Sequence, residues 1–96
     1  MSASLQALER LLAASEAMLA AAQNQNWEQL ASRETERRAM AESLPDAASA
    51  RLSIAEQARA RQLIEACLHC DARILPLIAT RMNELRVVLR EARPDA

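Results

Sequence analysis

The 96-residue chain contains no glycine, and this absence constrains its fold more than any other feature. Phosphate-binding loops of the P-loop and Rossmann kinds need glycine so that the backbone can approach the ligand. Two-residue β-hairpin turns are usually built with glycine as well. Alanine, leucine, glutamate and arginine dominate instead, and these residues favour helices. The sequence therefore predicts an all-α protein, and its length fits a single domain over residues 1–96.

Three helices are expected from the spacing of apolar residues and from their capping signals. Apolar residues recur every three or four positions in the first segment, which predicts a helix over residues 3–24. Asn26 is a good N-cap for a second helix over residues 27–43. Ser53 and Glu56 match a capping box, so a third helix is expected over residues 54–93.

The third helix contains Pro76, yet its apolar stripe keeps one phase on both sides of the proline. Proline inside a helix removes one hydrogen bond and usually kinks the helix. We expect one long helix bent near Pro76, and the alternative is a break near residues 72–74 that would give a four-helix bundle. The fold is then an antiparallel helical hairpin packed on a long third helix. The stripe comprises Leu63, Ile64, Cys67, Asp71, Ile74, Leu75, Ile78, Met82, Leu85 and Leu89.

Helix lengths indicate where a partner would bind. At about 1.5 Å per residue, the first two helices are too short to cover the whole third helix. The short link after Pro45 places them on its N-terminal half. An uncovered apolar stripe usually marks an interface of the helix-in-groove or coiled-coil kind. The predicted partner-binding residues are Ile74, Ile78, Met82, Leu85 and Leu89.

Four polar or amphipathic residues are expected on the inward faces and are assigned structural roles: Trp27, Glu34, Arg38 and Asp71. Glu34 and Arg38 are four residues apart with the acid first, which favours an intrahelical pair. Asp71 lies within an apolar stripe, where an unpaired charge would be costly to bury. Its candidate partners are the Trp27 indole, Arg38 and Asn24. Alternatively, Asp71 stays in water at the open end of the hairpin.

Composition argues against nucleic-acid binding and catalysis. The sequence has twelve arginines and thirteen acidic residues, so the basic surplus of a nucleic-acid binder is missing. A single histidine and the lack of glycine leave no constellation for nucleophilic catalysis, and we expect no enzyme activity and no cofactor.

The segment Cys67-Leu68-His69-Cys70 supplies too few ligands for a structural zinc site. We therefore expect no metal site, and Cys67 is interpreted as a small buried hydrophobe. No apolar run approaches the ~20 residues of a membrane span. Glu9 and Arg10 interrupt any signal-peptide pattern, so the cytoplasm is the expected location.

Read in order, these patterns resemble the FliT-type flagellar export chaperones of bacteria. The resemblance rests on an early leucine-rich helix ending in Met18-Leu19 and on the run Asn26-Trp27-Glu28-Gln29-Leu30. The Glu34…Arg37-Arg38 run follows, and then the stripe Ile64…Asp71…Ile74…Ile78…Leu85. Together they cover nearly the whole chain.

The resemblance implies a cytoplasmic chaperone that binds the C-terminal part of the flagellar filament-cap protein before type III export. It also implies contact with components of the export ATPase. Enteric members of the family restrain the master flagellar transcription activator, and a further C-terminal helix covers their binding surface. Because this sequence stops at Ala96, we expect it to lack that helix.

Two alternatives from other functional classes stay open. The stripe also suits self-association, so the chain could be a helical structural or adaptor protein that forms a homodimer. A small regulator that binds a flagellar transcription activator is the other alternative.

Overall fold

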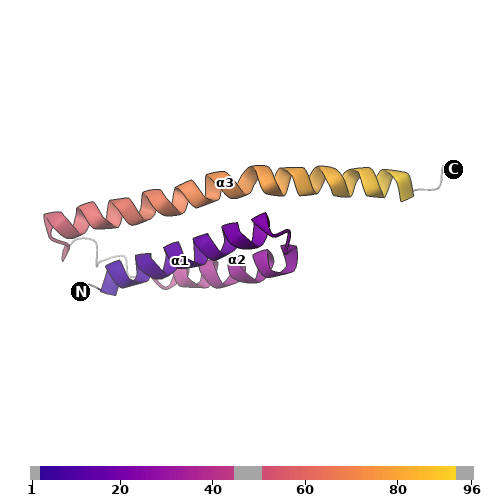
Figure 1. Ribbon diagram of the computed structural model, residues 1–96. Helices are drawn as coiled ribbons and strands as arrows, with labels where there is room; N and C mark the ends of the chain where they lie inside the picture. The colour runs from indigo at the N-terminus through magenta and orange to yellow at the C-terminus, as the bar shows by residue number, and fades with distance from the viewer. Residues whose placement is uncertain (1–2, 45–50, 93–96) are drawn as a thin grey trace.

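The computed structural model describes residues 3–44 and 51–92, which form three helices and, over those residues, no strand. Helix α1 spans Ala3–Gln23, α2 spans Trp27–Glu42 and α3 spans Ile54–Ala92. Helices α1 and α2 form a hairpin, and α3 runs alongside the hairpin and past it (Figure 1). The molecule measures 64 × 20 × 19 Å. The all-α prediction and the hairpin on a long third helix are confirmed.

The turn between α1 and α2 explains how a chain without glycine reverses direction. Gln25 adopts a left-handed backbone with φ of 58°, a conformation that glycine usually supplies at helix ends. The amides of Gln25 and Asn26 donate to the carbonyls of Ala22 and Ala21, which is the Schellman pattern. The Asn26 side chain then accepts from the Gln29 amide at 3.1 Å, so Asn26 caps α2 as predicted.

Helix α3 begins with the predicted capping box and continues without interruption through Pro76. The Glu56 amide donates to Ser53 Oγ at 3.1 Å, and the Ser53 amide donates to Glu56 Oε1 at 3.0 Å. Pro76 is exposed on the side away from the hairpin, where its missing N–H leaves no buried group unpaired. The single helix is therefore confirmed over the break near residues 72–74, and α3 is gently curved (Figure 1).

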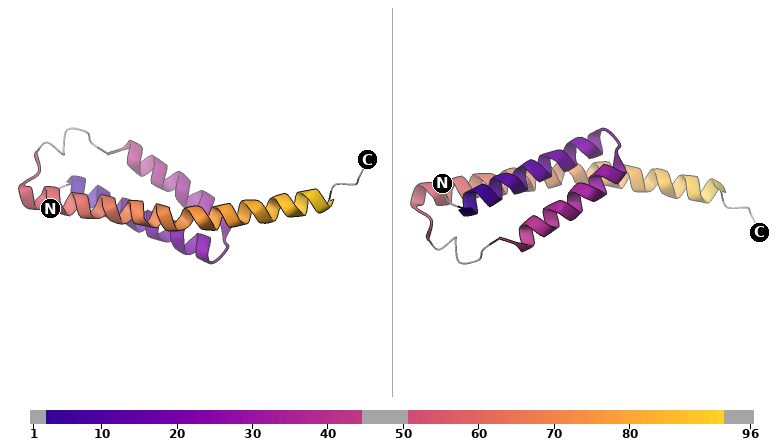
Figure 2. Two further views of the ribbon diagram at one scale, coloured as in Figure 1. Left: turned by 90° about the horizontal axis from the view of Figure 1, so that it is seen from above. Right: turned by 90° about the horizontal axis from the view of Figure 1, so that it is seen from below.

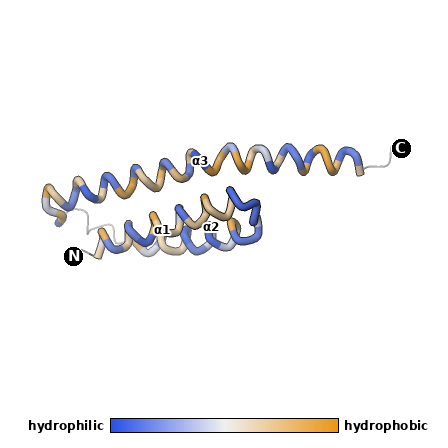
Figure 3. The backbone as a smooth tube through the Cα atoms, viewed as in Figure 1, coloured by the Kyte–Doolittle hydropathy of each residue, from blue (hydrophilic) through white to orange (hydrophobic). Residues whose placement is uncertain are grey.

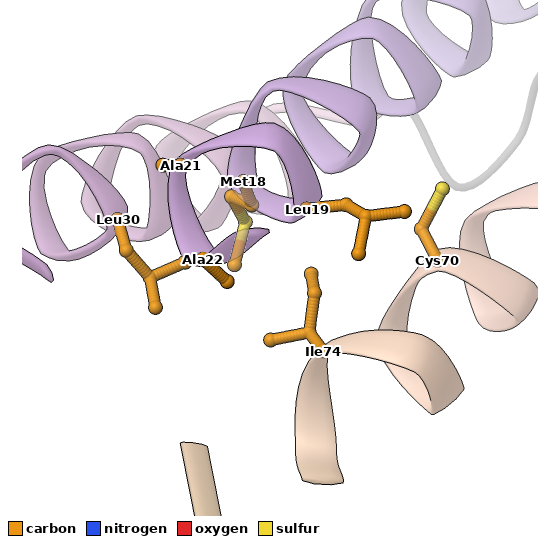
Figure 4. Packing of buried hydrophobic residues seen from close by; sticks show 7 residues of the cluster. All are labelled: Met18, Leu19, Ala21, Ala22, Leu30, Cys70 and Ile74. Atoms are coloured by element: carbon orange, nitrogen blue, oxygen red, sulfur yellow. The ribbon is translucent and has the colours of Figure 1, made fainter. Parts of the chain in front are cut away.

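Helix α1 supplies the core by packing against both of the other helices. One cluster lies near the turn, where Leu19 of α1 faces Cys70 and Ile74 of α3 (Figure 4). A second cluster joins Leu5 to Ala60 and Leu63 near the N-terminus of α3. The cluster nearer the N-terminus of α1 is also the one nearer the N-terminus of α3, so α1 and α3 are parallel. Helix α2 is antiparallel to both.

Helix α2 buries only one residue, Leu30, because it packs on α1 and diverges from α3 toward its C-terminal end (Figure 2). Arg38, which was expected on the inward face, is therefore exposed.

The side of α3 that faces the hairpin differs from the predicted stripe. Ile64 and Leu75 belong to the predicted stripe but are exposed, whereas Ala60 and Cys70 are buried in the core. Cys67, expected to be buried, is only partly so. The core residues of α1 include Ala14, Ala21 and Ala22. Small side chains allow two helix axes to approach closely, and this is why small residues of α3 take core positions.

Candidate partner-binding surface

An apolar groove lies at the turn end of the hairpin, where the α1–α2 turn meets α3. We call it the end groove. Its volume is about 390 Å³. Met18 and Leu30 extend the hydrophobic core into its floor, and α3 supplies its far wall. The lining residues are Met18, Trp27, Leu30, Ala31, Glu34, Ile78, Arg81, Met82 and Leu85.

Trp27 and Arg81 form a bridge across the end groove. The Arg81 guanidinium carbon lies 5.9 Å from the centre of the Trp27 ring, within range of a cation–π contact. Arg81 also lies 3.7 Å from the Glu84 carboxylate. This contact leaves the indole partly buried beside apolar side chains, so the groove offers an aromatic surface together with one charged group.

Beyond the end groove, α3 continues without any cover from the hairpin, and hydrophobic residues recur along this part (Figure 3). Leu89 is 66% exposed and Val88 is 59% exposed. Apolar side chains exposed in a row over successive turns are unusual in a protein without a partner. The end groove and the last turns of α3 therefore form one continuous apolar surface.

The structure divides the predicted partner-binding residues into three groups. Ile74 is buried in the core with 3% exposure, so the expectation that the uncovered stripe begins there is wrong. Ile78 packs partly against the core and lines the end groove. Met82, Leu85 and Leu89 are exposed. The uncovered part begins later because α1, running parallel to α3, brings the turn to the level of Ile78 and Arg81.

Asp71 has a different partner from those expected. Its Oδ1 accepts from Arg37 Nη1 at 2.5 Å, and the same nitrogen donates to Ser15 Oγ at 3.1 Å. Ser15 is fully buried in α1. The expected bonds from Trp27, Arg38 or Asn24 are replaced by this one, and Trp27 instead lies against Arg81, further along α3 than Asp71. Arg37 thus ties all three helices together.

The other predicted polar pair is present on the surface of α2. Arg38 donates to the Glu34 carboxylate four residues earlier. Glu34 lines the end groove, and both residues line a second groove of about 340 Å³ between α2 and α3, which we call the side groove. Its remaining lining residues are Leu11, Ser15, Arg37, Ala41 and Cys67.

The two cysteines lie on the side of α3 near the hairpin. Burial, and after it the nearby Glu16 carboxylate, raise the pKa of the Cys70 thiol above its ordinary value. A thiol that stays protonated is a poor nucleophile and a poor metal ligand. Over the described residues, no group of three or more His, Cys, Asp or Glu side chains could hold a metal ion.

Two features of this surface were not predicted from the sequence. Arg37 was not among the predicted structural residues, although its spacing of three from Glu34 and seven from Leu30 places it on the same side of α2. Arg81 lies in the mixed segment Thr80-Arg81-Met82-Asn83-Glu84, and its contact with Trp27 depends on the parallel register of α1 and α3.

Among residues 3–44 and 51–92, none of the helices is both long enough and apolar enough to cross a membrane. Comparison with curated proteins and with solved structures gave no match. Residues 5–95 match the family described as "Flagellar protein FliT". That match covers all three helices, the end groove and the uncovered turns of α3. The chain belongs to the FliT family of flagellar export chaperones.

Proposed function

We propose that this chaperone binds the flagellar filament-cap protein in the cytoplasm, before export, through the end groove and the last turns of α3. The observation that carries the proposal is the continuous apolar surface from Trp27 and Ile78 to Leu89, which no part of the described chain covers. An amphipathic helix of the client would place its apolar side there.

The shape of the surface limits what the client segment can be. The end groove is open on the side of the last turns of α3, so a helix can enter it and continue along Met82, Leu85 and Leu89. Arg81 and Glu34 stand at its edge, so polar side chains of the client would meet charges at the rim. We infer that the client segment is an amphipathic helix of several turns.

The test is binding of the purified chaperone to the C-terminal segment of the filament-cap protein, with matched variants. We expect Leu85→Asp to abolish binding, because a carboxylate would be desolvated in the groove. Val87→Asp makes a similar change about 200° around α3 from Leu85, at a residue 49% exposed, and should leave binding unchanged. Binding that survives Leu85→Asp, with circular dichroism showing both variants helical, would rule this surface out.

The family resemblance also favours contact with components of the export ATPase. The side groove supports this second proposal because it lies between α2 and α3 and shares only Glu34 with the end groove. Ala41 is exposed on its wall. We expect Ala41→Trp to fill the side groove and weaken binding to the ATPase components while client binding persists. Unchanged ATPase binding by Ala41→Trp would show that the side groove does not bind the ATPase components.

A further inference from the structure

Arg81 is the charged residue that α3 contributes to the lining of the end groove. It follows Ile78 by three residues and precedes Leu85 by four, so its side chain lies beside both of them on α3. Ile74, seven residues earlier, is on the same side of the helix and is 3% exposed in the core. The side of α3 that packs on the hairpin therefore continues, beyond the core, with an arginine.

A client helix in the end groove would come into contact with the Arg81 guanidinium. The proposed client path runs along α3 from Ile78 to Leu85 and onward, and Arg81 lies between these two residues. The Arg81 side chain is 39% exposed in the free chain, and a helix packed over it would remove much of the remaining water. A cation that loses water without gaining an anionic partner opposes binding. The client segment must therefore supply a partner for this charge.

The contacts of Arg81 within the chain leave it able to bind such a partner. Over residues 3–44 and 51–92 its one ion pair is with Glu84, at 3.7 Å. That distance is too long for a hydrogen bond, and Glu84 is 58% exposed, so the pair contributes little. The Trp27 ring lies 5.9 Å from the guanidinium carbon and attracts the cation through its π face. Since a guanidinium has five N–H donors, Arg81 keeps donors for a client.

The other charged lining residue of the end groove is already paired. The Glu34 carboxylate accepts from Arg38, four residues later on α2. The rest of the lining is apolar or, at Trp27, aromatic. Of the two charges in the groove, the positive one thus has the greater capacity for a new partner, and charge complementarity favours an acidic group on the client.

We propose that Arg81 recognises the client by binding the side-chain carboxylate of an aspartate or glutamate beside the apolar stripe of the client helix. The proposal rests on the proposed client function of the end groove and adds the chemistry that separates the client from other amphipathic helices. A carboxylate can accept two parallel hydrogen bonds from one guanidinium, and the contact with Trp27 holds the guanidinium at the groove before the client arrives. An apolar helix without the acid leaves Arg81 unpaired and binds more weakly.

The test is isothermal titration calorimetry of the purified full chain with the C-terminal segment of the filament-cap protein. Arg81→Glu should raise the dissociation constant (Kd) about thirtyfold, because a repulsion replaces an attraction. Arg81→Met keeps the apolar stem without adding a repulsion and should raise Kd about fivefold. Arg61→Glu makes the same change of net charge about 30 Å earlier on α3, at an exposed residue, and should leave Kd unchanged. Circular dichroism should show every variant to be helical.

Glu84→Gln separates recognition of the client from a structural role of Arg81. If Arg81 only fixed the end of the hairpin on α3, loss of its ionic neighbour would loosen the groove and raise Kd. If Arg81 binds an acid of the client, Glu84→Gln removes a competing carboxylate and should lower Kd about threefold. A raised Kd for Glu84→Gln would therefore overturn the proposal.

A charge exchange identifies the client carboxylate. Each acidic residue of the client segment is changed to arginine in turn, and one such change should restore the Kd of Arg81→Glu to within about threefold of the wild-type pair. The proposal is wrong if no exchange restores binding. It is also wrong if amidation of the C-terminus of the segment, rather than a side-chain change, removes the effect of Arg81→Glu, because the carboxylate is then the terminal one.

These outcomes differ from failure of the client site itself. If the client occupies the end groove without using Arg81, Leu85→Asp abolishes binding while Arg81→Glu leaves Kd unchanged, and only the role of Arg81 is overturned. A wild-type chain that does not bind the segment would overturn both proposals.

Discussion

At the scale of single residues, Arg37 shows how one side chain can hold three helices in place. Its Nη1 contacts Ser15 of α1 and Asp71 of α3, and its side chain is 25% exposed. Helix α2 buries only Leu30, so few apolar contacts hold it in place. The hydrogen bonds of Arg37 therefore help to hold α2 against α1 and α3, as apolar burial does elsewhere in the bundle.

Removing either charge should accordingly destabilise the bundle. We expect Arg37→Met and Asp71→Asn each to lower the free energy of unfolding by about 1–2 kcal/mol, the usual value of a partly buried hydrogen bond to a charged group. Urea unfolding of both single variants and the double variant measures their coupling, which should be about 1 kcal/mol. Arg33→Met removes a more exposed pair with Glu36 and is the control. Additive effects at positions 37 and 71 would contradict a direct interaction.

The sequence predicted that Asp71 would have a hydrogen-bond partner, but it did not identify Arg37 as that partner. An acid in an apolar stripe needs a partner, and the structure supplies one. The identity of the partner depended on the register between hairpin and α3, which sequence spacing within one helix does not contain. The register comes from contacts such as Leu5 with Leu63 and Leu19 with Ile74, between residues far apart in the chain.

At the scale of helices, the local signals were sufficient to locate the elements. Asn26 and the Ser53–Glu56 box mark two helix starts to the residue, because capping is a short-range interaction. The face of α3 was harder to predict. Its apolar residues belong to two adjacent faces, a buried core face and an exposed face that includes Ile64 and Leu75, and a single hydrophobic stripe merges them. Alanine and cysteine at the core face added little apolar signal.

The capping box gives the start of α3 a dependence on pH. The backbone and hydroxyl of Ser53, in that order, hold the pKa of the Glu56 carboxyl below its ordinary value of 4.5. The stabilisation is therefore complete above pH 4.5 and is lost as the pH falls through the lower pKa of the folded state. The protection of amides in the first turn of α3 against hydrogen exchange, relative to the intrinsic exchange rate at each pH, should fall over that range.

Glu56→Gln provides the control for this prediction. Glutamine keeps an oxygen that accepts from the Ser53 amide but has no charge to titrate. Exchange in the first turn of that variant should vary with pH only as the intrinsic chemistry of exchange requires. Equal pH profiles for the wild type and Glu56→Gln would show that the Glu56 carboxylate does not hold the helix start.

At the scale of the whole molecule, the length of α3 determines what the protein can bind. The hairpin ends at the level of Ile78 and Arg81, and α3 continues to Ala92. Met82, Leu85 and Leu89 are exposed on or beyond the wall of the end groove, whereas the exposed Leu68 lies before it. Sequence periodicity indicated an uncovered stripe but could not divide it between a client and a second copy, since both uses require apolar residues at helical spacing.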